Sequence, residues 1–187
     1  MNILLYANWK MNLGPFDSIE LIKKLTEEHL NKTVEVSYFP PIVSLHAVFQ
    51  QMKKTDDFIL GKTSLGAQNC DWREPGAVTG ETSSSMVKDI CSKILVGHSE
   101  RRRFFGENNA KINRKIRMII KNELVPVICI GEQSIEEGDH GWEILLATQI
   151  TSALITCGNE DRYIFAYEPE TSIGTGKPLS PDIAGER

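Results

Sequence analysis

Several kinds of feature are missing from this sequence of 187 residues, and each absence narrows its class. No apolar run approaches the roughly 20 residues of a membrane-spanning helix, which argues against a membrane protein. Residues 1–6 carry neither a charged leader nor a cleavage site, so they do not read as a secretory signal peptide. The cysteines at positions 70, 91, 129 and 157 lack close paired spacing, which disfavours a disulfide framework and a zinc site. Free thiols in a reducing cytoplasm fit better.

An excess of positive charge is missing as well. The formal net charge is −4, which argues against a dedicated nucleic-acid binder. After the first apolar run, the chain carries Asn8-Trp9-Lys10 where a dinucleotide-binding protein would carry a glycine-rich turn. Hydrophobic residues, in contrast, are abundant and make up 41% of the sequence. We therefore expect residues 1–187 to form a single globular domain.

Short apolar runs alternate with segments of helical periodicity along the chain. The runs cover residues 3–8, 34–39, 93–97, 125–130 and 162–167, and a further strand is expected to begin at Phe58-Ile59-Leu60-Gly61. Because the runs are short and continuous, they predict strands that are buried on both faces. Six such strands with helices between them indicate a parallel sheet with right-handed crossovers.

The segments between these strands also carry interpretable patterns. The helix expected after the fourth strand places four isoleucines on one face: Ile112, Ile116, Ile119 and Ile120. Its cationic residues are interpreted as a solvated face: Lys111, Arg114, Lys115, Arg117 and Lys121. The long polar stretch from Gly66 to Ser85 is interpreted as a projecting interface loop, with a surface excursion as the alternative. A short helix is expected from Met86 to Cys91.

The order of these elements favours a (β/α) barrel over an open doubly wound sheet, because the dinucleotide fingerprint is absent. A complete barrel of this kind has eight units and typically about 250 residues. Ser180-Pro181-Asp182 has the composition of a helix start, so a sixth helix is expected to begin just before the last residue, Arg187. With six units, the outer edges of the first and sixth strands would be unpaired.

Polar residues follow three of the expected strands, and in a barrel all strand carboxyl ends meet at one face. Lys10 follows the first strand, His98 the fourth and Glu168 the sixth. A cation, an imidazole and a carboxylate in one pocket suit proton transfer next to a carbonyl group. Each residue also has a simpler interpretation: His98 as a hydrogen-bonded structural histidine, Lys10 as a surface lysine, and Glu168 as a cap on a strand end.

Three motifs carry a resemblance to a known family. They are Asn8-Trp9-Lys10, Gly97-His98-Ser99-Glu100-Arg101-Arg102, and Tyr167-Glu168-Pro169 with Ile173-Gly174-Thr175-Gly176-Lys177. In this order, and each at a strand end, they resemble triosephosphate isomerase over nearly the whole chain. The resemblance implies an α/β fold, a TIM (β/α)8 barrel of which this chain carries the first six β/α units. It also implies a glycolytic and gluconeogenic enzyme that interconverts dihydroxyacetone phosphate and D-glyceraldehyde 3-phosphate.

The resemblance further implies a role for each site residue. Glu168 would be the base, His98 the group that polarises the carbonyl, and Lys10 the cation that holds substrate charge. Asn8 would contact the substrate, Glu100 would pair with Lys10, and the backbone N–H of Gly174, in a lid, would bind the phosphate. Neither a metal nor an organic cofactor is implied. Arg101, Arg102 and Glu107 are interpreted as internal salt-bridge residues.

A cytoplasmic homodimer is also implied. Its contact would be the loop of residues 68–81, with Thr79 near the tip inserted beside the partner's active site. The length of this loop supports that expectation.

Two departures from the family pattern keep alternatives open. Glu170-Thr171-Ser172 stands where the family usually has Val-Trp-Ala, and Pro178-Leu179 stands where it usually has Thr-Ala. One alternative is therefore an isomerase of a four-carbon sugar phosphate. Because the last two units of a barrel are missing from the sequence, a non-catalytic binding module is the other. For the same reason we expect residues 1–187 to be either part of a longer polypeptide or a fragment that cannot isomerise alone.

Overall fold

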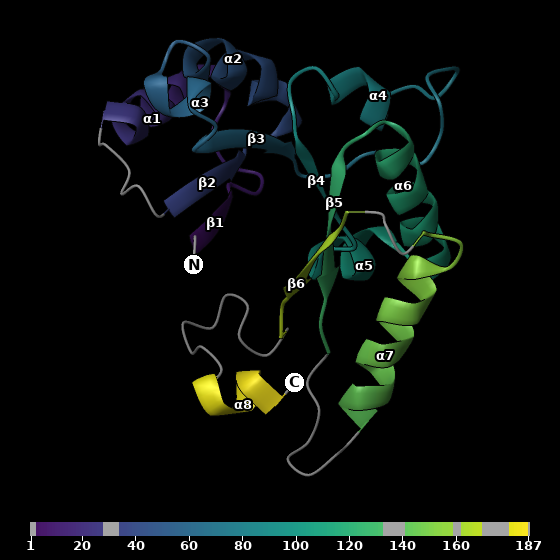
Figure 1. The fold of residues 1–187 in the computed structure, drawn as a ribbon. Helices are drawn as coiled ribbons and strands as arrows, with labels where there is room; N and C mark the ends of the chain where they lie inside the picture. The colour runs from purple at the N-terminus through teal and green to yellow at the C-terminus, as the bar shows by residue number, and fades with distance from the viewer. Residues whose placement is uncertain (1–2, 28–33, 133–140, 159–161, 170–179, 187) are drawn as a thin grey trace.

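The computed structural model describes residues 3–27, 34–132, 141–158, 162–169 and 180–186. Six strands form one parallel sheet in the order β1-β2-β3-β4-β5-β6 (Figure 1). Their bounds are β1 Ile3–Asn8, β2 Val34–Phe39, β3 Thr63–Ala67, β4 Lys93–Val96, β5 Val125–Ile130 and β6 Ile164–Tyr167. Each strand pairs with the next one in the chain, as the right-handed β/α units of a barrel require.

Most of the helices lie on the outer side of this curved sheet, and the last helix, Pro181–Glu186, lies apart from it (Figure 1). Their bounds are α1 Pro15–Glu27, α2 Ile42–Met52, α3 Asp56–Ile59, α4 Ser84–Val87, α5 Ser99–Phe105, α6 Asn109–Lys121, α7 Gly141–Leu154 and α8 Pro181–Glu186. The predicted fold class, an α/β barrel architecture represented by six β/α units, is confirmed. No helix in the described ranges is long and apolar enough to cross a membrane.

Both faces of the central strands are buried, as the continuous apolar runs predicted. Ile94, Val96 and Ile128 face the helices and belong to the large core cluster. Leu95 and Val127, at alternate positions, belong to a second cluster on the opposite face. That second cluster is centred on Phe39 and also contains Cys129. Its position inside the curve of the sheet puts it directly beneath the strand ends that carry the polar residues.

The first strand departs from this pattern. Ile3, Leu4 and Leu5 are 59%, 53% and 54% exposed, although their sequence predicts a strand buried on both faces. The reason is the position of β1, which ends the sheet and pairs with β2 alone among the described strands. The expected unpaired outer edge is therefore present at β1 within the described part of the chain, and Ile3, Leu4 and Leu5 are more than half exposed there.

Two predicted boundaries are wrong. Residues 58–61 do not begin a strand, because Asp56–Ile59 forms the short helix α3. Phe58 packs edge-on against Phe49 of α2, with ring centroids 5.9 Å apart, and Gly61 then turns the chain at a φ of 72° before β3 starts. The short helix predicted from Met86 to Cys91 instead spans Ser84–Val87.

The prediction of a fully solvated cationic face on α6 is wrong at one position. Lys115 is 3% exposed, whereas Arg114 and Arg117 on the same helix are exposed. The Lys115 ammonium donates hydrogen bonds to Glu107 and to Asn69, 2.6 Å from the Asn69 Oδ1. Arg101 donates to the same Glu107 oxygen, as the salt-bridge interpretation of that pair predicted. A buried lysine is tolerated here because its charge is paired and hydrogen-bonded.

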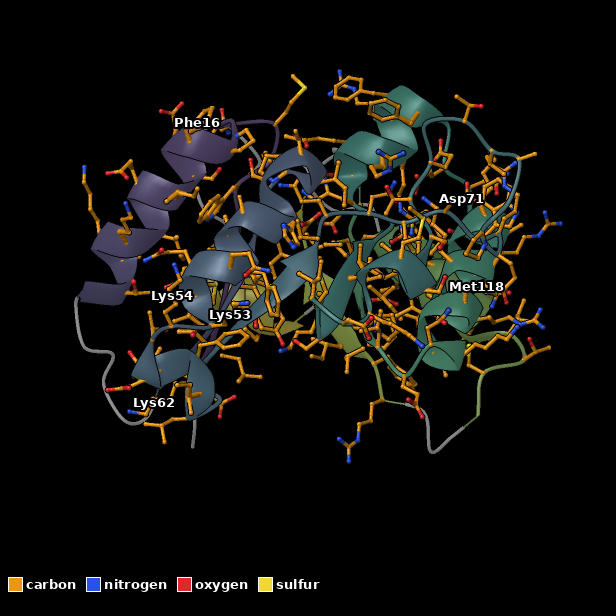
Figure 2. All side chains as sticks on the ribbon, turned by 90° about the horizontal axis from the view of Figure 1, so that it is seen from above. Phe16, Lys53, Lys54, Lys62, Asp71 and Met118 are labelled. Carbon is orange, nitrogen blue, oxygen red and sulfur yellow. The ribbon has the colours of Figure 1, made fainter. Side chains whose placement is uncertain are left out.

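The polar segment between β3 and α4 leaves the sheet as an ordered loop. Its two arms meet at a bridge between Asp71 and Ser83, and the Asp71 N–H donates to the carbonyl of Thr82 at 2.8 Å. Figure 2 shows Asp71 at the same end of the molecule as Met118 of α6, away from Phe16 on α1. The Ser84 hydroxyl ties the loop's end to α6 by donating to the Met118 carbonyl at 3.1 Å.

Candidate active site

Side chains from three strand ends form one connected polar group at the carboxyl edge of the sheet. Lys10 follows β1, and its Nζ lies 2.8 Å from Oε1 of Glu100. The other Glu100 oxygen lies 3.6 Å from Nδ1 of His98, which follows β4. The His98 Nε2 lies 3.4 Å from Oε1 of Glu168, which follows β6. Residues that are 90 and 70 positions apart in the chain are thus neighbours, as convergence of the strand ends predicted.

Lys10 is held in an unusual backbone conformation. Its φ is 53°, in the left-handed region that residues other than glycine rarely adopt. Two side chains support this turn: Asn8, whose Oδ1 accepts the Lys10 N–H at 2.9 Å, and Gln68, whose Nε2 donates to the Lys10 carbonyl at 2.8 Å. Backbone strain of this kind persists only where surrounding contacts over-determine it, and it concentrates at functional sites.

The hydrogen bonds of His98 determine which of its ring nitrogens carries a proton in the neutral form. His98 is the N-cap of α5, and its Nδ1 accepts the N–H of Glu100 at 3.2 Å. An accepting Nδ1 is deprotonated, so the neutral ring carries its proton on Nε2. The ring is 7% exposed, and the Nε2–H is directed toward the side of Glu168. The imidazole therefore presents a donor on the side of Glu168.

The carboxylate of Glu168 has the features expected of a catalytic base. Its side chain is 24% exposed, and its Oε2 is buried without a hydrogen-bond partner among the described residues. A buried, unsatisfied carboxylate oxygen is costly, and such a group in a native protein calls for an explanation such as a catalytic role. Burial raises the pKa of the neighbouring Cys129 thiol well above its usual range, and the negative charge of Glu168 and a hydrogen bond to it raise that pKa further. Cys129 is consequently a neutral neighbour of the carboxylate.

Glu100 links the cation to the histidine electrostatically. The hydrogen bond from Lys10 lowers the pKa of its carboxyl group, against an opposing effect of burial. The carboxylate therefore remains charged at neutral pH and fixes the Lys10 ammonium near the pocket. Because both side chains are 40% exposed, solvent screens this ion pair. The pair therefore contributes little to the stability of the fold, and its main effect is to hold the Lys10 ammonium in position.

The turn that carries His98 depends on a glycine and an arginine. Gly97 has a φ of 71°, and a Cβ there would lie 3.0 Å from Ile112 and 3.3 Å from the Cys129 carbonyl. The Arg102 Nε donates to the Gly97 carbonyl at 2.8 Å, and its other nitrogens donate to Asn109 and Cys129. Arg102 was expected to be an internal salt-bridge residue, and these hydrogen bonds make it a connector between the ends of β4 and β5.

One predicted site residue, Thr79, lies apart from this group. Thr79 is exposed in the loop of residues 68–81, as a contact residue at a loop tip would be. Gly174 and the altered residues 170–172 lie outside the described residues. Within the described ranges, no cluster of histidine, cysteine or acidic side chains has the arrangement of a metal site.

Three supporting residues escaped prediction from the sequence: Gln68, which binds the Lys10 carbonyl, and the pair Gly131 and Gln149, which are hydrogen-bonded to each other beside Glu168. Gln68 was expected only as part of the interface loop of residues 68–81. Gln149 had one detectable signal, because a glutamine stands on the same face of α7 as the buried Leu146 and Ala153. The contacts of Gln68 and Gly131 depend on chain segments brought together by folding, so no local pattern marks them.

Comparison with known proteins agrees with the fold. Residues 3–187 match the family model described as triosephosphate isomerase. A triosephosphate isomerase of Caldanaerobacter subterraneus is 37% identical over 98% of this chain and 73% of its own length. Those of Acidithiobacillus ferrooxidans and Dehalococcoides mccartyi are 37% and 35% identical, over 95% and 97% of this chain and 69% and 70% of their own lengths. The chain belongs to the triosephosphate isomerase family.

Proposed function

We propose that the protein interconverts dihydroxyacetone phosphate and D-glyceraldehyde 3-phosphate by proton transfer through an enediolate. The observation that carries the proposal is the pairing of a carboxylate, Glu168, whose Oε2 lacks a hydrogen-bond partner among the described residues, with the Nε2 of His98 at 3.4 Å, in a polar group that also contains the Lys10 ammonium. The family of the chain and the names of its relatives support the same activity. That activity would place the protein in glycolysis and gluconeogenesis.

Each of the three groups has one task in this mechanism. Glu168 removes a proton from the carbon next to the substrate carbonyl, while the His98 Nε2–H donates to the carbonyl oxygen. Lys10 stabilises the negative charge that develops on the oxygens. Glu168 then returns the proton to the adjacent carbon, while His98 transfers the hydroxyl proton from one oxygen of the enediolate to the other. Substrate and product have the same atoms and electrons, so the reaction is balanced without any co-reactant.

The experiment is an isomerase assay of the full-length protein with glyceraldehyde 3-phosphate, alongside Glu168→Gln and His98→Gln. We expect the unsubstituted full-length protein to turn over substrate, and both variants to lose mainly kcat, by roughly 100- to 10,000-fold for the base. Glu20→Gln, an exposed change on α1, serves as the control and should keep the full rate. A rate for the unsubstituted chain no higher than that of Glu168→Gln would refute the proposal.

The comparisons favour neither of the two alternatives. Measuring kcat/KM for three-carbon and four-carbon ketose phosphates tests the first, because a four-carbon isomerase would prefer the longer substrate. Phosphoglycolate, a mimic of the enediolate, tests the second, because a working site binds it and raises the melting temperature. The absence of any shift would favour a non-catalytic module. Substrate contacts by Asn8 and phosphate binding by Gly174 stay predictions.

We also propose a cytoplasmic homodimer formed through the loop of residues 68–81. Large apolar side chains are exposed at chain positions on α1, α4, α5 and the turn before α1: Met11, Phe16, Met86, Phe104 and Phe105. Scattered exposed apolar residues are ordinary, but a set of five large ones supports burial against a partner. Deleting residues 73–79 should give monomers of much reduced activity by light scattering and assay. A fully active monomer would contradict the proposal.

A further inference from the structure

The backbone of Glu168 lies against a glycine at the end of the neighbouring strand. The Glu168 N–H donates to the Ile130 carbonyl at 2.7 Å, which continues the β5–β6 ladder by one residue. At the next position, a Cβ on Gly131 would lie 1.9 Å from the Glu168 carbonyl oxygen and 2.8 Å from its carbonyl carbon. The backbone of Glu168 therefore rests directly on the peptide of Gly131, with no side chain between them.

Gly131 follows the end of β5 and has no side chain of its own to fix it. Both of its backbone groups are bound by one side chain, because its N–H donates to Oε1 of Gln149 at 3.0 Å and its carbonyl accepts from Nε2 of Gln149 at 2.8 Å. Gln149 lies on α7 and is 6% exposed. Two hydrogen bonds between the same pair of residues restrict rotation as well as translation, which a single bond does not.

From these contacts we infer that Gln149 is a positioning residue for the catalytic base. This inference rests on the proposed isomerase function for its catalytic consequence. The path has three steps: α7 carries Gln149, Gln149 fixes the Gly131 peptide, and that peptide sets the depth and tilt of the Glu168 backbone. The distance from Glu168 Oε1 to the His98 ring depends on this placement. Gln149 itself touches neither Glu168 nor His98 in the recorded hydrogen bonds.

A second contact joins the same two chain segments one residue away on each side. The Tyr167 hydroxyl donates to Oε1 of Glu132 at 2.8 Å, and Glu132 is 1% exposed. Residues 131–132 and 167–168 are thus joined through a backbone contact and a side-chain contact. This second contact holds Tyr167 and leaves the peptide of Gly131 to Gln149, so the two supports are separable by mutation.

Two properties of glutamine are needed at position 149: the length of its side chain, and an amide that both donates and accepts a hydrogen bond. A glutamate would accept the Gly131 N–H but would face the Gly131 carbonyl with a second acceptor. A leucine of similar volume would leave both buried backbone groups without that partner, and each such loss is costly. Gln149→Leu and Gln149→Glu should therefore be the most damaging substitutions. Gln149→Asn, which keeps both a donor and an acceptor on a shorter side chain, should be milder.

The test uses the full-length protein with Gln149→Leu, Gln149→Asn and, as a control of the same type at a partly exposed position of α2, Gln50→Leu. We expect Gln149→Leu to lower kcat by roughly 10- to 100-fold with KM changed less than about threefold, because misplacement by about 1 Å costs that much in rate. Combined with Glu168→Asp, whose shorter carboxylate is already misplaced, the same substitution should cost much less. Gln50→Leu should keep the unsubstituted kcat.

Amide hydrogen exchange gives a readout that does not depend on activity. In Gln149→Leu, the amides of Gly131 and Glu168 should exchange at least about tenfold faster, while amides in β2 stay as in the unsubstituted chain. An unsubstituted protein without isomerase activity would refute the proposed function. The hydrogen-exchange measurement would still show whether Gln149 fixes the backbone of Gly131 and Glu168. Unchanged exchange at Glu168, or an unchanged kcat in an active enzyme, would overturn the inference. If Gln149→Leu does not fold, the milder Gln149→Asn gives the same comparison.

Discussion

Replacing Lys115 by methionine tests the buried charge network most directly. The Lys115 side chain is 4% exposed and that of its partner Glu107 is 5% exposed. Methionine keeps the volume and the apolar stem, so the main losses are the charge-assisted bonds to Glu107 and to Asn69. The Glu107 carboxylate keeps Arg101, but its Oε2 already lacks a hydrogen-bond partner among the described residues. Its remaining charge is then poorly compensated.

The size of the effect follows from these contacts. A hydrogen bond to a charged group contributes about 1.5–3 kcal/mol, and breaking a buried ion pair costs about 3–5 kcal/mol. Because Arg101 remains, we expect the lower end, about 3 kcal/mol of unfolding free energy. For a chain of this size that corresponds to a fall in melting temperature of roughly 6–12 °C. Urea denaturation and calorimetry measure both quantities.

Lys121→Met is a matched control on the same helix. Lys121 pairs with Glu74, but the two side chains are 65% and 54% exposed, so this substitution should cost less than about 1 kcal/mol. Both lysines bind residues of the same segment after β3, and burial is the main difference between them. If Lys115→Met destabilised the protein no more than Lys121→Met, the assignment of a stabilising buried network would be refuted.

The pH dependence of the unfolding free energy provides a second test of the same prediction. Burial alone would raise the pKa of Glu107, but hydrogen bonds from Lys115 and Arg101 outweigh it and lower the pKa below 4.5. A carboxyl group whose pKa is lowered in the folded state contributes stability above its unfolded pKa and loses it as pH falls through the folded value. The stability difference between Lys115→Met and the unsubstituted chain should therefore be full at neutral pH and shrink below about pH 4.5.

Three further substitutions test the roles of the site residues, and a labelling experiment tests which cysteine thiol reacts first. Glu168→Gln should lower kcat by orders of magnitude with a melting temperature within a few degrees, since its Oε2 has no partner to lose among the described residues. Lys10→Ala should raise KM as well as lower kcat, and Gln68→Leu should raise KM with a smaller loss of kcat by releasing the Lys10 carbonyl. With iodoacetamide at pH 8, mass spectrometry should find Cys157 modified first. Burial raises the pKa of Cys70 to about 12, and the other two thiols are buried too.

The strands could be predicted from the sequence because their signal is local. Residues 3–8, 34–39 and 125–130 were predicted with the bounds that the structure has, since a continuous apolar run between polar breaks specifies a buried strand. The same local signal failed for Phe58 and Ile59, which are apolar but follow Thr55 and two aspartates that start a helix. It also failed to predict the exposure of Ile3, which depends on whether another strand lies beside β1.

The reacting residues were also predictable, whereas their supports were not. Lys10, His98 and Glu168 follow strands directly, so the convergence of strand ends brings them together without further information. Lys115 was assigned to solvent because it lies in a run of cationic residues. Its partners come from the segment after β3 and from the turn between α5 and α6, and only the folded chain brings them to it. Burial of a charge is decided by such distant partners.

One physical rule connects the supports of the three reacting residues. Each is positioned through backbone groups: Gln68 binds the carbonyl of Lys10, Arg102 binds that of Gly97 just before His98, and Gln149 binds the Gly131 peptide beneath Glu168. Binding the backbone fixes where a side chain starts and leaves its reactive atoms available. A support that bound the Glu168 carboxylate instead would hold it in place only by occupying the oxygen that has to accept the proton. The unsatisfied Oε2 and the doubly bound Gly131 are therefore two consequences of the same requirement.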